Sequence, residues 1–111
     1  MLIVKENGGI RLTRGDTAKF MFTIVNQLTK EPYVIKDTDK ITFTVKKTVR
    51  DTQYCFQKEV IGTDRFAVLP SDTEPYPFGV YYYDLQLTKE NGEVYTVIPP
   101  TSFEIMPEVT Y

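Results

Sequence analysis

Short segments in which apolar and polar residues alternate recur along the whole chain, and this feature most limits how the sequence can fold. Residues 41–46 (ITFTVK) show it most cleanly. Successive side chains of a β-strand point to opposite faces, so each such segment is typical of a strand that buries one face. In the longest segment, residues 80–88, we expect four side chains to point inward: Tyr81, Tyr83, Leu85 and Leu87.

The remaining segments with strand character are separated by turn residues at short, regular spacing, and no segment has convincing amphipathic helical periodicity. They are residues 10–13, 18–24, 54–60, 65–69, 93–98 and 102–106. Many short strands of this kind favour an all-β fold, an antiparallel sandwich or a barrel. A chain of 111 residues has the size of one domain, so residues 1–111 are predicted to form a single unit.

The hairpin at Asn91-Gly92 decides which residues face the core near the end of the chain. A two-residue type I′ loop there requires positive φ at both positions and places Leu87 opposite Thr96. A three-residue loop would turn the side chains that follow the hairpin to the opposite faces of the sheet. The sequence favours the two-residue loop, with the buried face carrying Leu85 and Ile98 as a further pair.

That register predicts an outward surface that could contact another protein. It consists of Tyr82, Tyr95 and Val97, because aromatic residues are enriched at interfaces. Pro99-Pro100 is expected to interrupt the ladder and to leave residues 101–106 as a strand at a sheet edge. An exposed edge strand can pair with another chain. The edge and the outward surface are therefore predicted to lie in one interface.

The tripeptide Arg14-Gly15-Asp16 matches the motif that animal adhesion receptors recognise. It stands between a short extended segment and the alternating segment from residue 18, where the chain must bend. Gly15 supplies freedom in φ and Asp16 can bond its own backbone, so a turn is the favoured interpretation. The adhesion alternative requires the loop to protrude.

Composition excludes most catalytic chemistry and several classes of partner. The chain has no histidine and one cysteine, Cys55, so it lacks the common general base, the usual zinc ligands and an internal disulfide. It has no Gly-rich phosphate loop. We expect no enzyme activity, cofactor or metal site. Asp37 and Asp39 are interpreted as turn aspartates rather than calcium ligands.

The 13 basic and 15 acidic residues form no basic patch that would indicate nucleic acid or an anionic membrane as a partner. The start of the chain, MLIVKENGG, has too few apolar residues for a signal peptide or a spanning helix. Synthesis and folding in the cytoplasm are therefore predicted.

Three stretches resemble the immunoglobulin-like domains of tailed-phage structural proteins, such as the N-terminal domain of baseplate upper proteins. They are LTRGDTAKFMFTI, KITFTVKK and LPSDTEPYPFGVYYYDLQLTKENGEVYTV. The matching motifs are a Gly-Asp-Thr turn, a Thr-Phe-Thr-Val-Lys-Lys strand, an Asp-Thr segment, a Gly-x-Tyr-x-Tyr-Asp strand and an Asn-Gly hairpin. They fall within residues 10–106.

The resemblance implies an immunoglobulin-like antiparallel β-sandwich of about seven strands. It also implies that Tyr81, with Tyr83 as the rival, turns its hydroxyl back onto upstream backbone as a tyrosine corner. The implied function is that of a non-enzymatic tail or baseplate component of a phage or prophage particle. Its partners would be other phage structural proteins or further copies of itself. The alternative is a carbohydrate- or receptor-binding module, which a concave aromatic patch with converging polar groups would indicate.

Overall fold

The computed structural model describes residues 2–4, 8–25 and 28–108, which form an all-β fold with one helical turn. Ten strands are present in this part of the chain, and three of them have only two or three residues. The elements are β1 (Leu2–Val4), β2 (Ile10–Thr13), β3 (Ala18–Met21), β4 (Ile24–Val25), β5 (Pro32–Tyr33), β6 (Lys40–Lys46), β7 (Phe56–Ile61), β8 (Arg65–Val68), α1 (Pro70–Thr73), β9 (Gly79–Thr88) and β10 (Val94–Met106).

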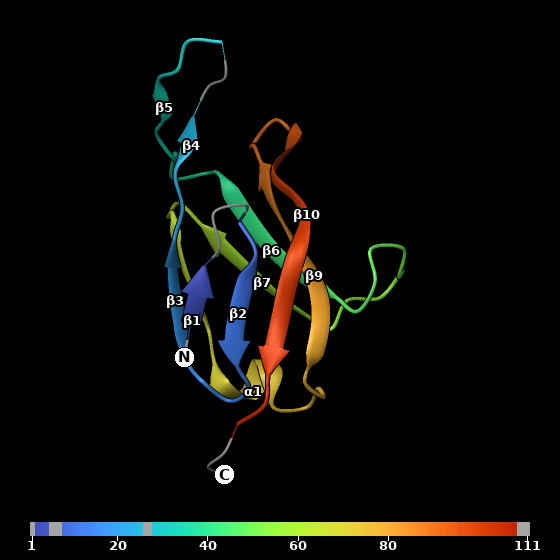
Figure 1. Cartoon of the computed structure of the whole chain (residues 1–111). Coiled ribbons are helices and arrows are strands. Elements are labelled where there is room, and N and C mark those ends of the chain that lie inside the picture. The colour runs from blue at the N-terminus through green and yellow to red at the C-terminus, as the bar shows by residue number, and fades with distance from the viewer. Residues whose placement is uncertain (1, 5–7, 26–27, 109–111) are drawn as a thin grey trace.

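The strands form three sheets (Figure 1). The largest has six strands in the order β1-β2-β10-β9-β6-β7, and β3 pairs with β8 in a second sheet. A third pair, β4 with β5, belongs to the arm, which we define as residues 22–25 and 28–35. The arm extends beyond the rest of the molecule in Figure 1. All pairs are antiparallel except β2 with β10, so the sheet is mixed rather than fully antiparallel.

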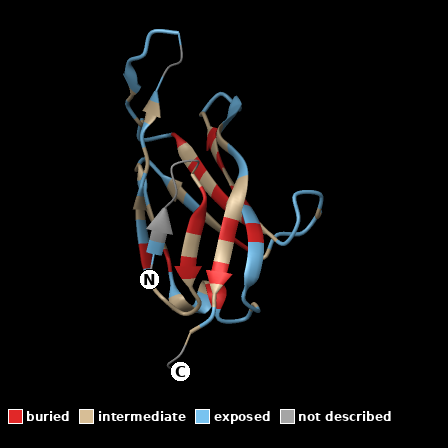
Figure 2. Cartoon of the chain, viewed as in Figure 1, coloured by how far each residue is buried: buried red, intermediate tan, exposed pale blue. Residues whose placement is uncertain are grey.

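The core lies on one face of the six-stranded sheet, as the alternation predicts. In β9 the four expected side chains, Tyr81, Tyr83, Leu85 and Leu87, are at most 5% exposed. Figure 2 shows buried residues alternating with less buried ones along these strands.

The β3–β8 sheet covers part of this inner face through aromatic side chains. The rings of Phe20 and Phe66 lie 6.2 and 4.8 Å from the ring of Phe43 on β6, measured between centroids. Phe43 also contacts the rings of Phe56 and Phe103. Phe43 is therefore the centre of an aromatic cluster that joins the two sheets.

Residues 101–106 do not form an edge strand, contrary to the sequence prediction. They belong to the continuous strand β10, which lies between β2 and β9. The pairing of β10 with β9 shifts between Ile98 and Thr101, and Pro99 and Pro100 lie in the resulting bulge. They fit there because residues in the bulge do not have to donate a backbone N–H hydrogen bond to β9. The edges of the six-stranded sheet are β1 and β7.

The β9–β10 hairpin has a three-residue loop, so the predicted register is wrong. Tyr95, and not Thr96, lies opposite Leu87. In this loop only Gly92 has a positive φ, of 91°. The loop is a tight turn closed by the hydrogen bond from Gly92 N to Lys89 O, and a one-residue bulge follows the turn. A register shift further along β10 restores the predicted pairing of Leu85 with Ile98.

Helix α1 was not expected from the sequence. It is one turn long, with Pro70 in its first turn and Asp72 accepting a hydrogen bond from Leu69 N at 2.7 Å. A single turn is too short to give periodicity. Among the described residues, no helix has the length and apolar character needed to cross a membrane.

Candidate functional site

The structure does not bring the predicted contact residues Tyr82, Tyr95 and Val97 onto one face. Tyr82 points to the outer face of the six-stranded sheet and is 37% exposed. Tyr95 lies directly opposite Leu87, and opposite residues of an antiparallel pair share a face, so Tyr95 is on the inner side. Val97 packs partly against the core. The three-residue loop is the physical reason for this correction.

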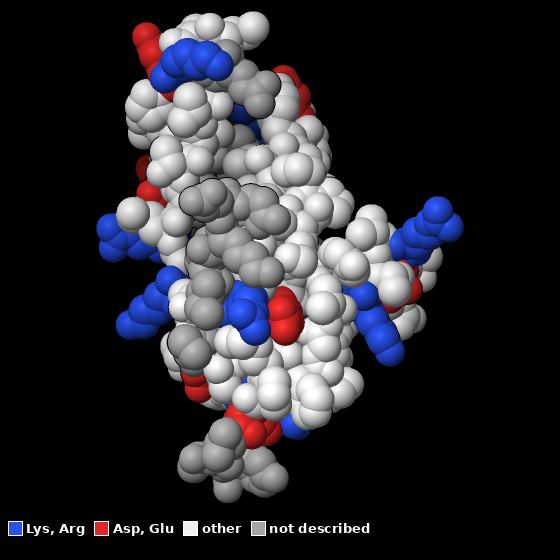
Figure 3. All heavy atoms as spheres, in the orientation of Figure 1, with Lys and Arg blue, Asp and Glu red and all other residues white. Residues whose placement is uncertain are grey.

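The inner position of Tyr95 creates a groove at the base of the arm, which we call the arm groove. It lies between β4–β5 on one side and the β9–β10 hairpin on the other, and its volume is about 580 Å³. In Figure 3 a hollow opens beside the arm, with Lys or Arg atoms visible at its back. Its lining is mostly apolar or hydroxylated: Thr23, Ile24, Val25, Tyr33, Leu87, Lys89, Tyr95, Thr96 and Val97.

Lys89 is the charged residue of this lining. Its Nζ lies 5.2 Å from the ring centroid of Tyr33 and 5.5 Å from that of Tyr95, within the range of cation–π attraction. Within the described part of the chain, no carboxylate lies within ion-pair distance of it, although Asp39 and Glu93 are near enough for its charge to lower the pKa of both. A cation therefore sits in the arm groove between two aromatic rings, near Asp39 and Glu93 but not in an ion pair with either.

Asp39 fixes the base of the arm. Its side chain accepts hydrogen bonds from the Tyr33 hydroxyl at 2.6 Å and from Lys36 N at 2.9 Å, and the residue is only 2% exposed. Burial raises the pKa of Asp39, but these two hydrogen bonds, together with the nearby charges of Lys36 and Lys89, outweigh it, so the pKa is lowered overall. The hydrogen bond to Asp39, helped by burial, raises the pKa of Tyr33 to about 12. Tyr33 is thus oriented toward the groove.

Tyr95 is oriented from the other wall. Its hydroxyl donates to the carboxylate of Glu93, which also accepts from Asn91 Nδ2 at 2.7 Å. Hydrogen bonds from Tyr95 and Asn91 lower the pKa of Glu93, and the bond to Glu93 raises the pKa of Tyr95. The turn residue Asn91 therefore helps to place a groove residue.

The stretch of β10 beside the arm groove has one free edge. Within β10, strand β2 pairs only with Phe103–Met106, so in the described part of the chain the residues of β10 before Phe103 are paired on the β9 side alone. Lys89 N donates a hydrogen bond to Glu93 O, so these two residues form a hydrogen-bonded pair, and this fixes which of the following β9–β10 pairs are hydrogen-bonded. The backbone groups of Tyr95 therefore point toward β9, and those of Val94 and Thr96 point away from it.

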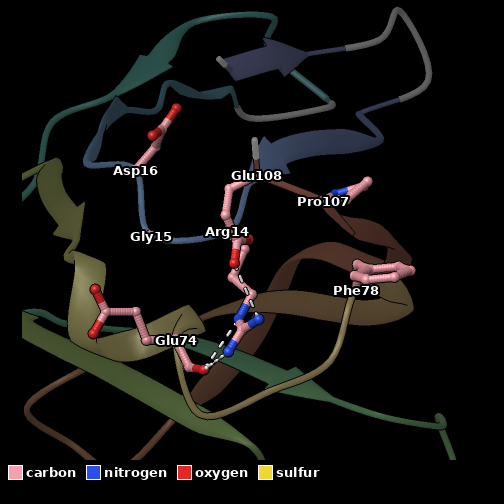
Figure 4. Close-up of a pocket in the computed structure, with 7 residues that line it drawn as sticks. All are labelled: Arg14, Gly15, Asp16, Glu74, Phe78, Pro107 and Glu108. Carbon is pink, nitrogen blue, oxygen red and sulfur yellow. Dashed lines mark hydrogen bonds and ion pairs between the residues drawn. The ribbon is translucent and has the colours of Figure 1, made fainter. Parts of the chain in front are cut away.

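A second groove lies at the opposite end of the molecule and contains the adhesion-like tripeptide (Figure 4). Arg14 Nε donates to Glu74 O at 3.1 Å, and its NH1 contacts Glu108 Oε1 at 3.2 Å. Asp16 points away from Arg14 in Figure 4. Because the guanidinium is bound to its own chain, the tripeptide does not project both charges together.

The segment around Gly15 forms a turn. Gly15 has a φ of 83°, and its N–H donates to the hydroxyl of the fully buried Thr73 at 2.8 Å. Asp16 N donates to Thr13 O at 3.0 Å, which closes the turn. The turn is thereby attached to α1.

Two tyrosine hydroxyls of β9 bond to backbone. Tyr81 donates to Pro77 O at 2.7 Å, four residues upstream, whereas Tyr83 donates to the distant Gly8 O. Burial raises the pKa of both. In addition, Tyr76 donates to Cys55 O, so the segment between α1 and β9 is held at several points.

No group of three or more His, Cys, Asp and Glu side chains in the described residues is arranged to hold a metal ion. No protein-family model matches the chain, and no curated protein matches its sequence. Sequence reasoning missed Tyr33 and Lys89 as groove residues and Asp39 as the residue that orients Tyr33. They come from three separate segments, and no local pattern indicates that they meet.

Proposed function

We propose that this chain is a non-enzymatic structural module of a tailed-phage or prophage particle, with an immunoglobulin-like fold, and that it acts by binding neighbouring proteins. The sequence resemblance described above motivates the virion role. Three features of the structure support parts of the proposal: the distribution of strands between the sheets, the Tyr81 hydrogen bond and the exposed arm.

The distribution of strands is consistent with an immunoglobulin-like sandwich. In that fold strands B and E share one sheet, and strands C, F and G share the other, with C′ added beside C in the variable type. Here β3 and β8 share the smaller sheet, whereas β6, β9 and β10 are neighbours in the larger one, with β7 beside β6. The chain order of these six strands agrees with B, C, C′, E, F and G.

The hydrogen bond from Tyr81 to Pro77 O has the form of a tyrosine corner, in which a tyrosine near the start of strand F bonds backbone a few residues upstream. Tyr81 is the third residue of β9, the strand that corresponds to F. Tyr83, the rival, bonds outside the corner.

The arm carries the protein-binding part of the proposal. Leu28 is 95% exposed, Val34 78% and Val25 49%, all on a two-stranded extension. Isolated two-stranded hairpins are marginally stable, and clustered exposed apolar side chains mark interaction sites. An arm of this composition gains stability when a neighbouring protein covers it.

Particle composition tests the virion role. We expect the chain to co-sediment with phage particles purified from the strain that encodes it, in a fixed ratio to a major tail protein, as measured by quantitative mass spectrometry. Particles from a strain without the gene are the control. Intact particles that contain none of the chain would overturn the proposal.

A matched pair of variants tests the arm. Leu28→Asp should remain folded but be lost from the particles, because the charge would have to be buried on docking. Val49→Asp adds the same charge at another exposed apolar residue, in the loop after β6, and should be incorporated normally. Equal incorporation of both variants would show that the arm is not the docking element.

The arm groove favours a second candidate, carbohydrate binding. Two tyrosine rings and Lys89 converge there, an arrangement that suits stacking and hydrogen bonding to a sugar. A glycan array probed with the wild-type chain and with Tyr95→Ala checks it. This candidate predicts glycan binding that the substitution abolishes.

A further inference from the structure

We propose that the arm groove is a site of β-strand addition. An extended segment of a partner protein pairs with the free edge of β10 at Val94 and Thr96, and it places an acidic side chain against Lys89. This inference rests on the proposed protein-binding function and names the surface and the kind of segment that it binds.

The first argument for strand addition is the unpaired backbone edge of β10. The N–H and C=O groups of Val94 and Thr96 point away from β9, and both residues are exposed. Unpaired strand edges of this kind bind extended peptides through main-chain hydrogen bonds. Pro99 and Pro100 have no N–H, so the added strand cannot continue past Ile98. The site is therefore short and ends at a defined residue.

The walls of the arm groove suit a strand in particular. Residues Thr23, Ile24 and Val25 of the arm form one wall, and the β9–β10 hairpin forms the other. Leu87 and Val97 supply an apolar surface to the lining. Alternate side chains of an added strand point to opposite faces, so one set meets this apolar surface while the other faces solvent.

Lys89 sets the charge of the partner. It is the charged side chain of the lining and makes cation–π contacts. Asp39 and Glu93 lie near enough to feel its charge, but neither is within ion-pair distance, so its Nζ can still bind a carboxylate of the partner. A carboxylate that reaches its Nζ forms a charge-assisted hydrogen bond, which is stronger than a neutral one. The favoured segment therefore alternates apolar and polar residues and includes an Asp or Glu.

The two walls are held in place before binding. Asp39 fixes Tyr33 on the arm side, and Glu93 fixes Tyr95 on the hairpin side. The two tyrosine side chains therefore need little ordering when the strand enters. Preorganisation of this kind favours binding because less conformational entropy is lost.

The experiment uses a displayed library of random ten-residue peptides, selected on the immobilised full chain. We expect enriched peptides to alternate apolar and polar residues, with an acidic residue at one fixed position. Binding of a synthetic enriched peptide should shift the backbone amide NMR signals of residues 94–97 and of β4. Lys89→Met should weaken its binding roughly tenfold or more, the effect of losing a hydrogen bond to a charged group. Lys47→Met, at an exposed lysine after β6, should have no effect.

Thr96→Pro tests the backbone contact. It removes one N–H from the free edge of β10 without removing a bond to β9, and it should abolish peptide binding. Thr52→Pro, in the exposed loop between β6 and β7, is the control. Circular dichroism shows whether each proline variant is folded. If Thr96→Pro fails to fold, Lys89→Met and the NMR shifts decide.

Several results would overturn the inference: no enrichment of peptides, binding that Lys89→Met leaves unchanged, or NMR shifts confined to another surface. Self-association that Thr96→Pro abolishes would make a second copy the occupant, and glycan binding without peptide binding would make it a sugar. Each contradicts a separate partner segment. Because incorporation into particles is measured independently, failure here leaves the virion role intact, and absence from particles does not affect this test.

Discussion

The inner face of the six-stranded sheet is covered in two different ways. Over the half nearer α1, the β3–β8 sheet packs Phe20 and Phe66 directly onto Phe43. Over the other half, the arm leaves a groove above Leu87 and beside Tyr95. The same sheet thus has a sealed half and an open half, and exposed apolar side chains gather on the arm of the open half.

The difference shows how a small all-β fold can be stable and still leave part of its inner face open, the part that we propose as a binding surface. The sealed half contains fully buried aromatic rings and a helical turn fixed to the β2–β3 turn. The open half is defined by a few side-chain hydrogen bonds among Tyr33, Asp39, Glu93 and Tyr95. Global stability should therefore depend mainly on the sealed half and the proposed binding on the open half, so substitutions should separate the two.

The largest expected effect is in the sealed half. Phe43→Ala removes the central ring of the aromatic cluster and should lower the free energy of unfolding by about 3–5 kcal/mol. Urea denaturation followed by circular dichroism measures it. Phe78→Ala, at a phenylalanine that is 62% exposed, is the control and should cost far less. Similar losses for the two would mean that Phe43 is not central to the core.

Asp39→Ala should have the next largest effect, because it leaves the Tyr33 hydroxyl and Lys36 N–H without their acceptor. We expect a loss of about 2 kcal/mol. Asp37→Ala, at an exposed neighbour, is the matched control. Hydrogen exchange should show faster exchange in the arm than in β9. A uniform increase over the whole molecule would argue against a local role for Asp39.

Tyr81→Phe should cost about 1 kcal/mol, since it removes one buried hydrogen bond to Pro77 O and little else. Tyr54→Phe, at a tyrosine that is 53% exposed, serves as the comparison. Equal effects of the two substitutions in thermal or urea denaturation would exclude the corner role of Tyr81.

The pH dependence of stability should reveal Tyr33. Its pKa in the folded protein is about 12, above its ordinary value of 10.0. Between these values the unfolded chain releases the proton and the folded chain keeps it, so this contribution is complete below pH 10 and is lost as the pH rises toward 12. Tyr33→Phe should therefore lose less stability than the wild type between pH 9 and about 11. An identical loss would show that Tyr33 keeps its ordinary pKa.

The smallest effect on stability is expected for Tyr95→Lys, within about 0.5 kcal/mol, because Tyr95 is 47% exposed. Its effect on association should be large by comparison. Analytical ultracentrifugation of the variant beside the wild-type chain measures that association, with circular dichroism as the folding control. A variant that unfolds would place Tyr95 in the core instead of the open half.

The sequence predicts the strands well where alternation is long, as in β6 and β9, because burial of one face dictates the pattern. It fails where the backbone departs from regular pairing. The loop after Leu87 has one residue more than predicted, and that single residue moved Tyr95 to the other face. Asn-Gly is compatible with a two-residue loop and with a three-residue loop, so the sequence alone does not decide between them.

The candidate site was less predictable than the fold. Tyr33, Lys89 and Tyr95 meet only because the arm folds over the end of the β9–β10 hairpin. The two strands of the arm have two residues each, too few for a periodic signal. Long-range placement of this kind depends on tertiary packing, which local patterns do not specify.

The position of β10 has a consequence for the order of folding. This strand separates β2 from β9, and Ile10 pairs with Phe103. During synthesis β2 can pair with β1, but its pairing with β10 must wait until residues 103–106 have been made. Contacts between residues so far apart in sequence slow folding, because the loop must close before the contact stabilises it. Until β10 emerges from the ribosome, β2 and β9 each have one unpaired edge facing the place that β10 will take, and such edges are prone to aggregation.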